Sequence, residues 1–191
     1  AVCFNSGTAA LHASLSALNL REKDEVIVPS ISFISSATAI LHQGCKPIFC
    51  DVKLDNYCLD SKSLESKITK NTKAIIPVHF AGSACEMAEI TRIAKKYKLK
   101  IIEDCSQAHG TKIKNKKVGS LGDISCFSFY ATKHMTTGEG GILCTNSKKI
   151  NDYCKSFRNH GMVDRDTHVL LGYNYRMSEI NASIGMVQLK K

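Results

Sequence analysis

The 191-residue chain has no tryptophan, only three prolines, and no apolar run near the roughly 18–20 residues that span a bilayer. It also shows no basic-then-apolar leader, no internal repeat and no low-complexity linker. These absences exclude a membrane-spanning helix and a recognisable secretory signal. We therefore expect a cytoplasmic protein with no membrane partner.

Closely spaced cysteine pairs are also missing, although the chain has nine cysteines. No two of them have the Cys-x-x-Cys spacing of common zinc sites. Their number is odd, and Cys50, Cys126 and Cys144 lie in apolar runs. This pattern favours reduced, buried thiols over a disulfide framework. No metal site is expected.

Acidic residues are in the minority, since 26 lysines and arginines against 17 aspartates and glutamates give a net charge of +9. Nucleic-acid binding is one interpretation of such a charge. However, the lysines are scattered, and their one tight cluster, Lys112 to Lys117, is typical of a solvated hairpin or loop around Asn115. We expect no nucleic-acid partner. The positive field would instead favour an acidic small substrate, such as a phosphorylated one.

Short apolar runs alternate with helical patterns along the whole chain. The runs predict buried strands at 26–28, 47–50, 74–78, 100–102, 124–130 and 141–145, the last two paired with each other. Apolar spacing predicts helices around Leu11 to Leu18, from Met87 to Tyr97, from Lys148 to Phe157, and from Ser178 onward. This alternation indicates an α/β sheet covered on both faces, with ligands bound at the carboxyl ends of the strands.

The two ends of the chain suggest a piece of a longer protein. Ala1 leads directly into structured-looking sequence, and Lys190-Lys191 fall inside a helical pattern. A single domain with a sizeable core is expected from the length and from the hydrophobic fraction of 43%.

A phosphate site is one interpretation of Ser6-Gly7-Thr8, which precedes the first predicted helix. Such a turn offers free backbone N–H groups, hydroxyls and the positive end of a helix dipole. The same residue types are also common helix caps, so the turn alone leaves both interpretations open.

An acidic pair, Glu103-Asp104, closes the predicted strand at 100–102. An acid at this position lies where parallel sheets bind ligands. It could cap the next helix, bind a metal or pair with a cationic group of a ligand. Gln107 and His109 follow it closely.

Lys133 lies between the apolar run that ends at Tyr130 and a glycine-rich stretch, Gly138 to Gly141. A lysine amine in a partly dry pocket can act as a nucleophile toward aldehydes. Asp104, Ser128 and Lys133 belong to the ends of two successive predicted strands. With the Ser-Gly-Thr turn, they offer what pyridoxal phosphate requires: a phosphate anchor, a carboxylate for the pyridine nitrogen and an amine for the aldehyde.

Seven segments in order along the chain resemble the DegT/DnrJ/EryC1/StrS group of nucleotide-sugar aminotransferases. They are Asn5–Leu11, Asp24–Ser30, Pro77–Gly82, Glu103–Gly110, Ser128–Lys133, Gly138–Gly141 and Gly172–Met177. The resemblance implies a pyridoxal-phosphate enzyme of the aspartate aminotransferase fold (fold type I). That fold is a three-layer α/β/α sandwich around a mostly parallel sheet. Residues 1–191 would form the large cofactor domain, without the N-terminal segment and the small C-terminal domain of the family.

The resemblance also implies a role for each matching residue. Lys133 matches the Schiff-base lysine, and Asp104 matches the partner of the pyridine nitrogen. The other cofactor contacts it implies are Gln107 beside the ring hydroxyl, Phe33 stacked on the ring, and Gly7, Thr8 and Ser128 around the phosphate. Asn174 matches a residue that reaches the phosphate in the neighbouring subunit, and Arg176 lies beside it. A homodimer with shared active sites is therefore implied.

Four histidines are tempting as acid–base groups. The family pattern has His at 79 and 109, and often in the segment that contains His160. We interpret these three, and His134, as structural or pocket-lining residues. His134 adjoins Lys133, where the group often has Asn, so it could tune substrate choice.

The activity implied is an aminotransferase reaction. An amino group would move, with L-glutamate as the donor, to a keto-sugar linked to a nucleotide. This is a step in making amino-deoxysugars for cell-surface polysaccharides or secondary metabolites. Three alternatives stay open: a sugar dehydratase of the same fold, a cyclitol aminotransferase, and a pyridoxal-phosphate-binding regulator without turnover.

Overall fold

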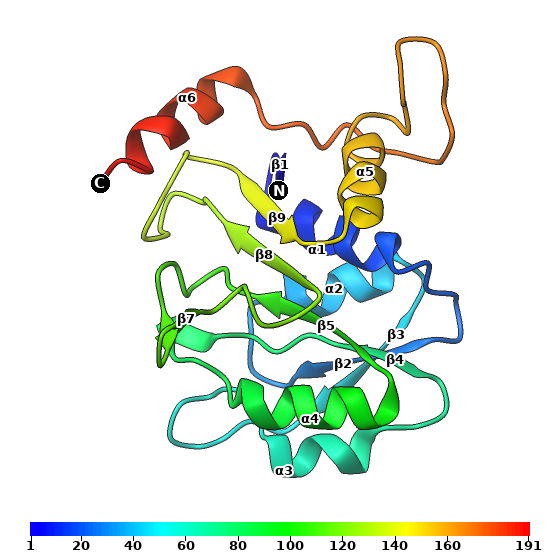
Figure 1. Cartoon of the computed structure of the whole chain (residues 1–191), viewed down its shortest axis with the longest axis vertical. Coiled ribbons are helices and arrows are strands. Elements are labelled where there is room, and N and C mark those ends of the chain that lie inside the picture. The colour runs from blue at the N-terminus through cyan, green and yellow to red at the C-terminus, as the bar shows by residue number, and fades with distance from the viewer.

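A computed structural model describes all residues, 1–191. Its main element is a seven-stranded sheet in the order β1-β9-β8-β5-β4-β2-β3 (Figure 1). Only β9 runs against its neighbours, so the sheet is mostly parallel, as expected. The strands are β1 (Val2–Phe4), β2 (Glu25–Pro29), β3 (Lys46–Cys50), β4 (Thr72–Ile75), β5 (Lys100–Asp104), β8 (Ile124–Ser128) and β9 (Gly141–Thr145).

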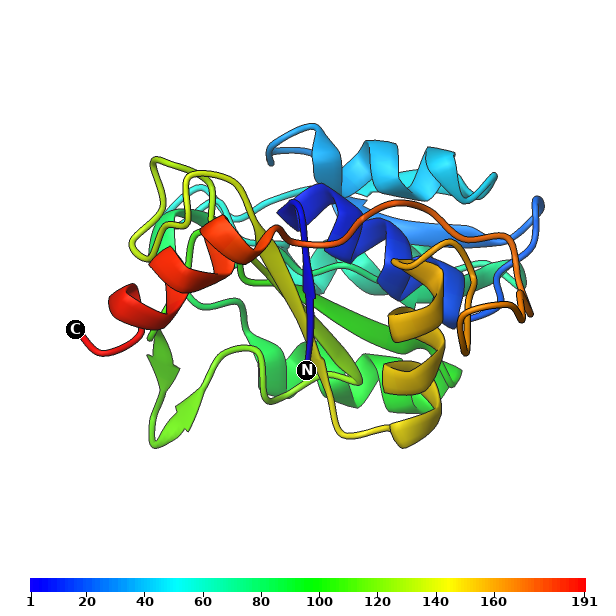
Figure 2. The same ribbon diagram turned by 90° about the horizontal axis from the view of Figure 1, so that it is seen from above.

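Helices cover both faces of the sheet, which confirms the three-layer α/β/α arrangement (Figure 2). One face carries α1 (Gly7–Ala17), α2 (Ser35–His42) and α5 (Lys148–Phe157). The other carries α3 (Ser61–Leu64) and α4 (Met87–Tyr97), with the short 3₁₀ turn η1 (Glu65–Lys67). A separate buried cluster lies on each face, because a sheet flanked by helices must bury both of its sides.

Helix α1 is buried on nearly all sides rather than on one face. Its small residues Ala9, Ala10, Ala13 and Ser14 are buried together with Leu11 and Leu15. The helix is packed between the sheet, α2 and α5, and small side chains permit that close approach. Its N-terminus therefore has a fixed position at the edge of the sheet.

The strand expected at 74–78 is shorter than predicted, because β4 ends at Ile75. Pro77 has no backbone N–H and cannot continue the ladder. Its carbonyl still accepts from the Asp104 N–H at 2.9 Å, and His79 donates its N–H to the Asp104 carbonyl at 3.0 Å. The segment after β4 thus stays beside the end of β5.

The helix patterns were right in type, but Tyr97 in α4 and three apolar residues of the last helix (Ile180, Ile184 and Val187) are exposed and are not core residues. In α4, Met87, Ile90 and Ile93 are buried, whereas Tyr97 is partly exposed and donates its hydroxyl to Glu65. Helix α6 (Glu179–Gln188) begins after its cap Ser178, and its apolar residues are exposed because it stands apart from the sheet (Figure 1). Every helix is too short or too polar to span a bilayer.

The lysine cluster forms the hairpin that its spacing predicts. Strands β6 (Lys112–Ile113) and β7 (Lys116–Lys117) pair antiparallel around Lys114-Asn115. Three of the strands and α-helices were not predicted: β1, α2 and α3. Helix α2 begins with Ser35-Ser36-Ala37-Thr38, and serine and threonine lower helix propensity, so no clear pattern marks it.

Candidate functional site

A cavity of about 360 Å³ lies at the carboxyl edge of the sheet. This is a typical size for a small-molecule site. Strands β5 and β8 end there, β9 begins there, and α1 and α2 point their N-termini toward it. Its lining includes Gly7, Thr8, Phe33, Asp104, Gln107, Ser128 and Lys133, so seven of the eight predicted cofactor contacts come together.

One end of the cavity is built to hold an anion. Ser6 caps α1, and its Oγ accepts the N–H of Ala9 at 3.1 Å. The N–H groups of Gly7 and Thr8 lie in the first helical turn, where no intrahelical acceptor exists. With the helix dipole, these donors favour a negatively charged group such as a phosphate. Ser6 is therefore both the helix cap and part of a possible phosphate site.

Gly7 lets the first turn of α1 approach β8 closely. A Cβ atom at Gly7 would lie 2.9 Å from the Cβ of Ser128, a distance that side chains do not tolerate. The helix N-terminus and the Ser128 hydroxyl consequently face the same small space. Thr8 also lines the cavity and contributes a second hydroxyl. Its Oγ1 lies 2.8 Å from the Oγ of Ser35 at the start of α2.

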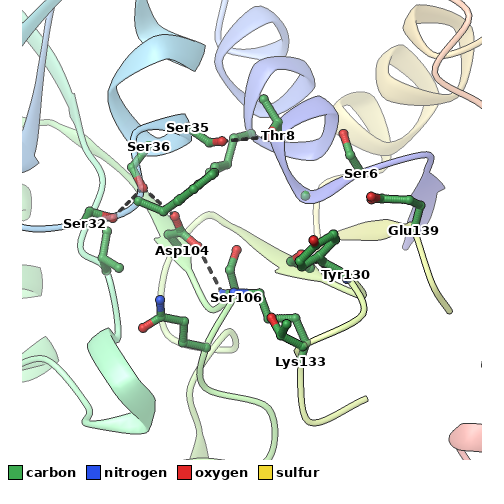
Figure 3. Close-up of a pocket in the computed structure, with 17 residues that line it drawn as sticks. Ser6, Thr8, Ser32, Ser35, Ser36, Asp104, Ser106, Tyr130, Lys133 and Glu139 are labelled. Carbon is green, nitrogen blue, oxygen red and sulfur yellow. Dashed lines mark hydrogen bonds between the residues drawn. The ribbon is translucent and has the colours of Figure 1, made fainter. Parts of the chain in front are cut away.

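Asp104 lies deeper in the cavity and is 3% exposed. Its Oδ1 accepts the backbone N–H of Ser106 at 3.0 Å, and its Oδ2 accepts the hydroxyl of Ser36 at 2.8 Å. Figure 3 shows this carboxylate between the two serines. Of the three roles open for an acid here, the helix cap is wrong, because turns rather than a helix follow β5.

Gln107 has a defined amide orientation. The backbone N–H of Ala81 donates to its Oε1 at 2.7 Å. Ala81 lies in the 3₁₀ turn η2 (Phe80–Gly82) with a left-handed backbone, at φ 49° and ψ 30°. That conformation is uncommon for a residue with a side chain. With Oε1 occupied by Ala81, the NH₂ group is the part of the amide that remains available to donate to a ligand.

Lys133 lies on the loop between β8 and β9. The base of this loop is closed at Phe129, whose N–H donates to the Gly140 carbonyl at 2.8 Å and whose carbonyl accepts the Thr137 N–H at 2.9 Å. The Lys133 N–H donates to the Tyr130 carbonyl at 2.9 Å, which forms a turn at the lysine itself. In Figure 3 the Lys133 side chain borders the same hollow as Asp104. The loop thus brings an amine to the cavity that holds the carboxylate.

Glu103, the neighbour of Asp104, is turned away from the cavity. It is fully buried, and it accepts hydrogen bonds from His79 Nε2 and from the N–H groups of Gly119, Leu121 and Gly122. Burial raises the pKa of Glu103, but the hydrogen bonds from His79 and the three amides outweigh it and hold the pKa below its usual value. Glu103 is thus a structural carboxylate.

Phe33 and Asn174 have different positions relative to the cavity. Phe33 lines it and is 68% exposed, which is unusual for an aromatic residue without a partner. Asn174 is exposed and is not part of the lining. Its carbonyl accepts from Asn5 Nδ2 at 3.4 Å, and the neighbouring Arg176 donates to Asn159 Oδ1 at 2.7 Å.

None of the four histidines lines the cavity. His79 is buried with both ring nitrogens bonded, to Glu103 and to the Cys85 N–H, so it has a structural role. His109 packs its ring against Phe127, and burial lowers its pKa. His134 and His160 are exposed.

Sequence reasoning missed several residues of the lining. The three serines Ser32, Ser35 and Ser36 belong to α2 or the segment before it, and Tyr130, Thr132 and Glu139 lie on the β8–β9 loop that carries Lys133. The only signal for the serines was a serine-rich stretch after the strand that ends at Pro29. Because α2 was not predicted, this serine-rich stretch could not be placed beside the cavity from the sequence alone.

Comparison with known proteins gives the family. Residues 1–191 match the DegT/DnrJ/EryC1/StrS aminotransferase family, and the chain belongs to it. GDP-perosamine synthase of Escherichia coli O157:H7 is 46% identical, covering 100% of this chain and 53% of that relative. The predicted resemblance is therefore confirmed over the whole chain.

Solved structures agree with this assignment. The chain matches Helicobacter pylori PseC, an aminotransferase involved in the biosynthesis of pseudoaminic acid, with a TM-score of 0.93 and 37% identity over 99% of this chain and 52% of that one. NtdA from Bacillus subtilis, solved with bound cofactor PMP, matches with a TM-score of 0.94 and 35% identity over 99% and 43%. The chain spans about half the length of the relatives that it matches.

The cavity fits the cofactor of this family, pyridoxal phosphate. Its donor set combines an amine, a buried carboxylate, an amide and a helix N-terminus, which are the partners that the aldehyde, pyridine nitrogen, ring hydroxyl and phosphate need. A Cβ atom at Gly7 would crowd the phosphate end against Ser128. The glycine therefore leaves room where a phosphate would bind.

Proposed function

We propose that this chain is the cofactor-binding part of an aminotransferase that uses pyridoxal phosphate. It would move an amino group from an amino acid, L-glutamate, to a keto-sugar carried on a nucleotide. The observation that carries the proposal is the convergence of Lys133, Asp104 and the α1 N-terminus on one cavity in a member of this family. Relatives named as nucleotide-sugar aminotransferases support the substrate class.

We infer that residues 1–191 form the large domain of the enzyme. The alignment with GDP-perosamine synthase covers 100% of this chain but 53% of that relative's length. Additional residues would then enclose the sugar nucleotide beside the cavity. The net charge of +9 would favour such an anionic substrate through its long-range field.

Lys133 would perform the covalent and proton-transfer work. Its amine would hold the cofactor through the aldehyde carbon, with the aldehyde oxygen lost as water, until the amine of the donor replaces it on that carbon. The freed Nζ would then take the proton from the donor's α carbon. Bound pyridoxal phosphate supplies an electron sink for that carbon. The turn at Tyr130 and the loop closure at Phe129 support this role, since they fix the backbone that carries the lysine.

Asp104 and Gln107 would control the charge on the ring. Asp104 would hold a proton on the pyridine nitrogen, because a buried carboxylate favours a nearby positive charge. Gln107 would donate its NH₂ group to the ring oxygen, since its Oε1 already accepts from Ala81. Phe33 would stack on the ring and keep water from one face.

Thr8, Ser128 and the N–H groups around Gly7 would hold the phosphate from within one subunit. Asn174 would hold it from the other subunit of a homodimer, because in this subunit Asn174 is exposed and lies outside the lining. Each active site would then need two chains.

The test is the absorption spectrum of the full-length enzyme with pyridoxal phosphate, before and after L-glutamate. We expect a visible band that glutamate bleaches and that a nucleotide-linked keto-sugar restores. Lys133→Ala should lose the covalent band, because no amine remains at that position. An unchanged visible band in Lys133→Ala would contradict the assignment of the lysine.

The same experiment separates the other reactions considered. A band that glutamate does not bleach would favour a regulator that binds the cofactor without turnover. Bleaching by glutamate with recovery only by a cyclitol ketone would favour a cyclitol aminotransferase. Release of water from the sugar without net amino transfer would favour a dehydratase.

A further inference from the structure

Helix α2 and the segment before it place a short chain of hydroxyls behind Asp104. Ser36 is 2% exposed, and its Oγ lies 2.8 Å from Asp104 Oδ2 and 2.8 Å from the Oγ of Ser32. Figure 3 shows the three side chains in a line, with dashed hydrogen bonds between them. Ser32 and Ser36 are far from Asp104 in the sequence, and neither was predicted to belong to the site.

The direction of the two hydrogen bonds follows from their chemistry. An ionised carboxylate only accepts, so Ser36 must donate its single hydroxyl proton to Asp104. Ser36 can then only accept from Ser32, which must be the donor of the second bond. The chain therefore runs from Ser32 through Ser36 to Asp104, and each bond polarises the next.

The carboxylate is held from two sides. Ser106 donates its backbone N–H to Oδ1 at 3.0 Å, while Ser36 donates to Oδ2 at 2.8 Å. Hydrogen bonds to a charged group are among the stronger ones in proteins. With one donor on each oxygen, the plane of the carboxylate is fixed, and the remaining lone pairs are available to the cavity that Asp104 lines.

The Ser36 hydroxyl is not explained by packing or by helix geometry. Its neighbours Ala37, Ala39 and Ile40 bury the apolar side of α2. Ser14 shows the contrasting case of a buried hydroxyl that donates to a backbone carbonyl, that of Leu11 at 2.6 Å. Ser36 donates instead to the carboxylate of Asp104 in the cavity, so its hydrogen bond holds a residue of the site and not the backbone of its own helix.

We propose that Ser36, with Ser32 as its donor, is a positioning residue that orients Asp104 toward the ring nitrogen of bound pyridoxal phosphate. This inference rests on the proposed function. Without Ser36, the carboxylate would lose one of its two protein donors and could rotate away from the ring. The ring nitrogen would then keep its proton less firmly.

The experiment uses the full-length enzyme and three variants: Ser36→Ala, Ser32→Ala and, as a matched control, Ser14→Ala. Each variant removes one hydroxyl. The readouts are the dissociation constant of pyridoxal phosphate, the pH midpoint of the visible band, and the Tm of the cofactor-free protein.

Ser36→Ala should weaken pyridoxal phosphate binding by roughly tenfold, the loss expected for a hydrogen bond to a charged group. The pH midpoint of the visible band should rise, because less positive charge on the ring favours a proton on the lysine nitrogen beside it. Ser32→Ala should shift both quantities in the same direction by less. Ser14→Ala should change only the Tm.

A Ser36→Ala enzyme with the wild-type dissociation constant and pH midpoint would overturn the inference. If Ser36→Ala does not fold, wild-type values in Ser32→Ala would overturn it instead. A wild-type enzyme that develops no visible band with pyridoxal phosphate would contradict the proposed function itself, and this outcome is distinct from a failure in the variants alone.

Discussion

His79 Nε2 donates to Glu103 Oε2 at 3.1 Å, and both side chains are fully buried. The Cys85 N–H donates to Nδ1 of the same ring, so the proton of the neutral imidazole must lie on Nε2. Glu103 also accepts hydrogen bonds from three backbone N–H groups of the 119–122 loop. This pair fixes the end of β5, and Asp104 projects into the cavity from the next position.

Replacing Glu103 by Gln should destabilise the fold by about 3 kcal/mol, because an amide NH₂ group would face N–H donors in a buried site. Urea unfolding measures the change. Glu89→Gln is the matched control, since Glu89 is exposed and pairs with Arg92 on the surface. It should change stability little. Equal stabilities of the two variants would contradict the structural role of Glu103.

Acidification should destabilise the protein through His12. Burial, and then the nearby His42, lower the pKa of His12 from 6.5 to about 4. The unfolded chain therefore takes up a proton at a pH where the folded chain does not. Stability is fully present above pH 6.5 and falls as the pH drops toward 4, by at most about 3 kcal/mol.

Urea unfolding at several pH values between 7.5 and 4.5 measures this slope. His12→Phe should reduce it, because phenylalanine fills the space beside Phe157 and Tyr173 without titrating, although it loses the hydrogen bond to Tyr175. His168→Asn at an exposed site is the control and should keep the slope. A slope that survives in His12→Phe would assign the effect to another group.

Gly7→Ala should weaken pyridoxal phosphate binding by roughly tenfold or more, because the new Cβ would lie 2.9 Å from Ser128 Cβ and push α1 away from β8. The dissociation constant is the direct measurement. Gly44→Ala is a useful comparison. Gly44 has φ +75° and open space around it, so its replacement strains the backbone without touching the cavity. In Gly44→Ala the free energy of unfolding should fall, while the dissociation constant of pyridoxal phosphate should keep its wild-type value.

Shared active sites can be tested by mixing two inactive variants. Lys133→Ala removes a residue of a chain's own site, whereas Asn174→Ala would remove a residue that acts in the partner's site. A hybrid dimer would contain one intact site, so random mixing after mild dissociation should restore about a quarter of the wild-type activity. Recovery should be absent if Asn174 acts within its own subunit. A monomer in analytical ultracentrifugation would also contradict the shared site.

Local patterns in the sequence predicted most of the fold because they reflect local physics. Apolar runs became the strands of a parallel sheet, and the spacing of apolar residues placed α4 and α5. That Lys133 and Asp104 line one cavity could be predicted, because a parallel sheet brings the ends of its strands to one edge. Boundaries were less accurate: β4 ends early, since Pro77 cannot extend the ladder.

What the sequence determined by itself was the sheet-and-helix alternation, the family pattern and most of the residues that line the cavity. Only the tertiary structure decided that Glu103 is buried against His79 and the 119–122 loop, how Gln107 is oriented, and that Ser36 holds a carboxylate 68 positions away. Propensity acts between near neighbours in the chain, whereas these contacts depend on the order in which distant strands pair and on the helices that pack over them.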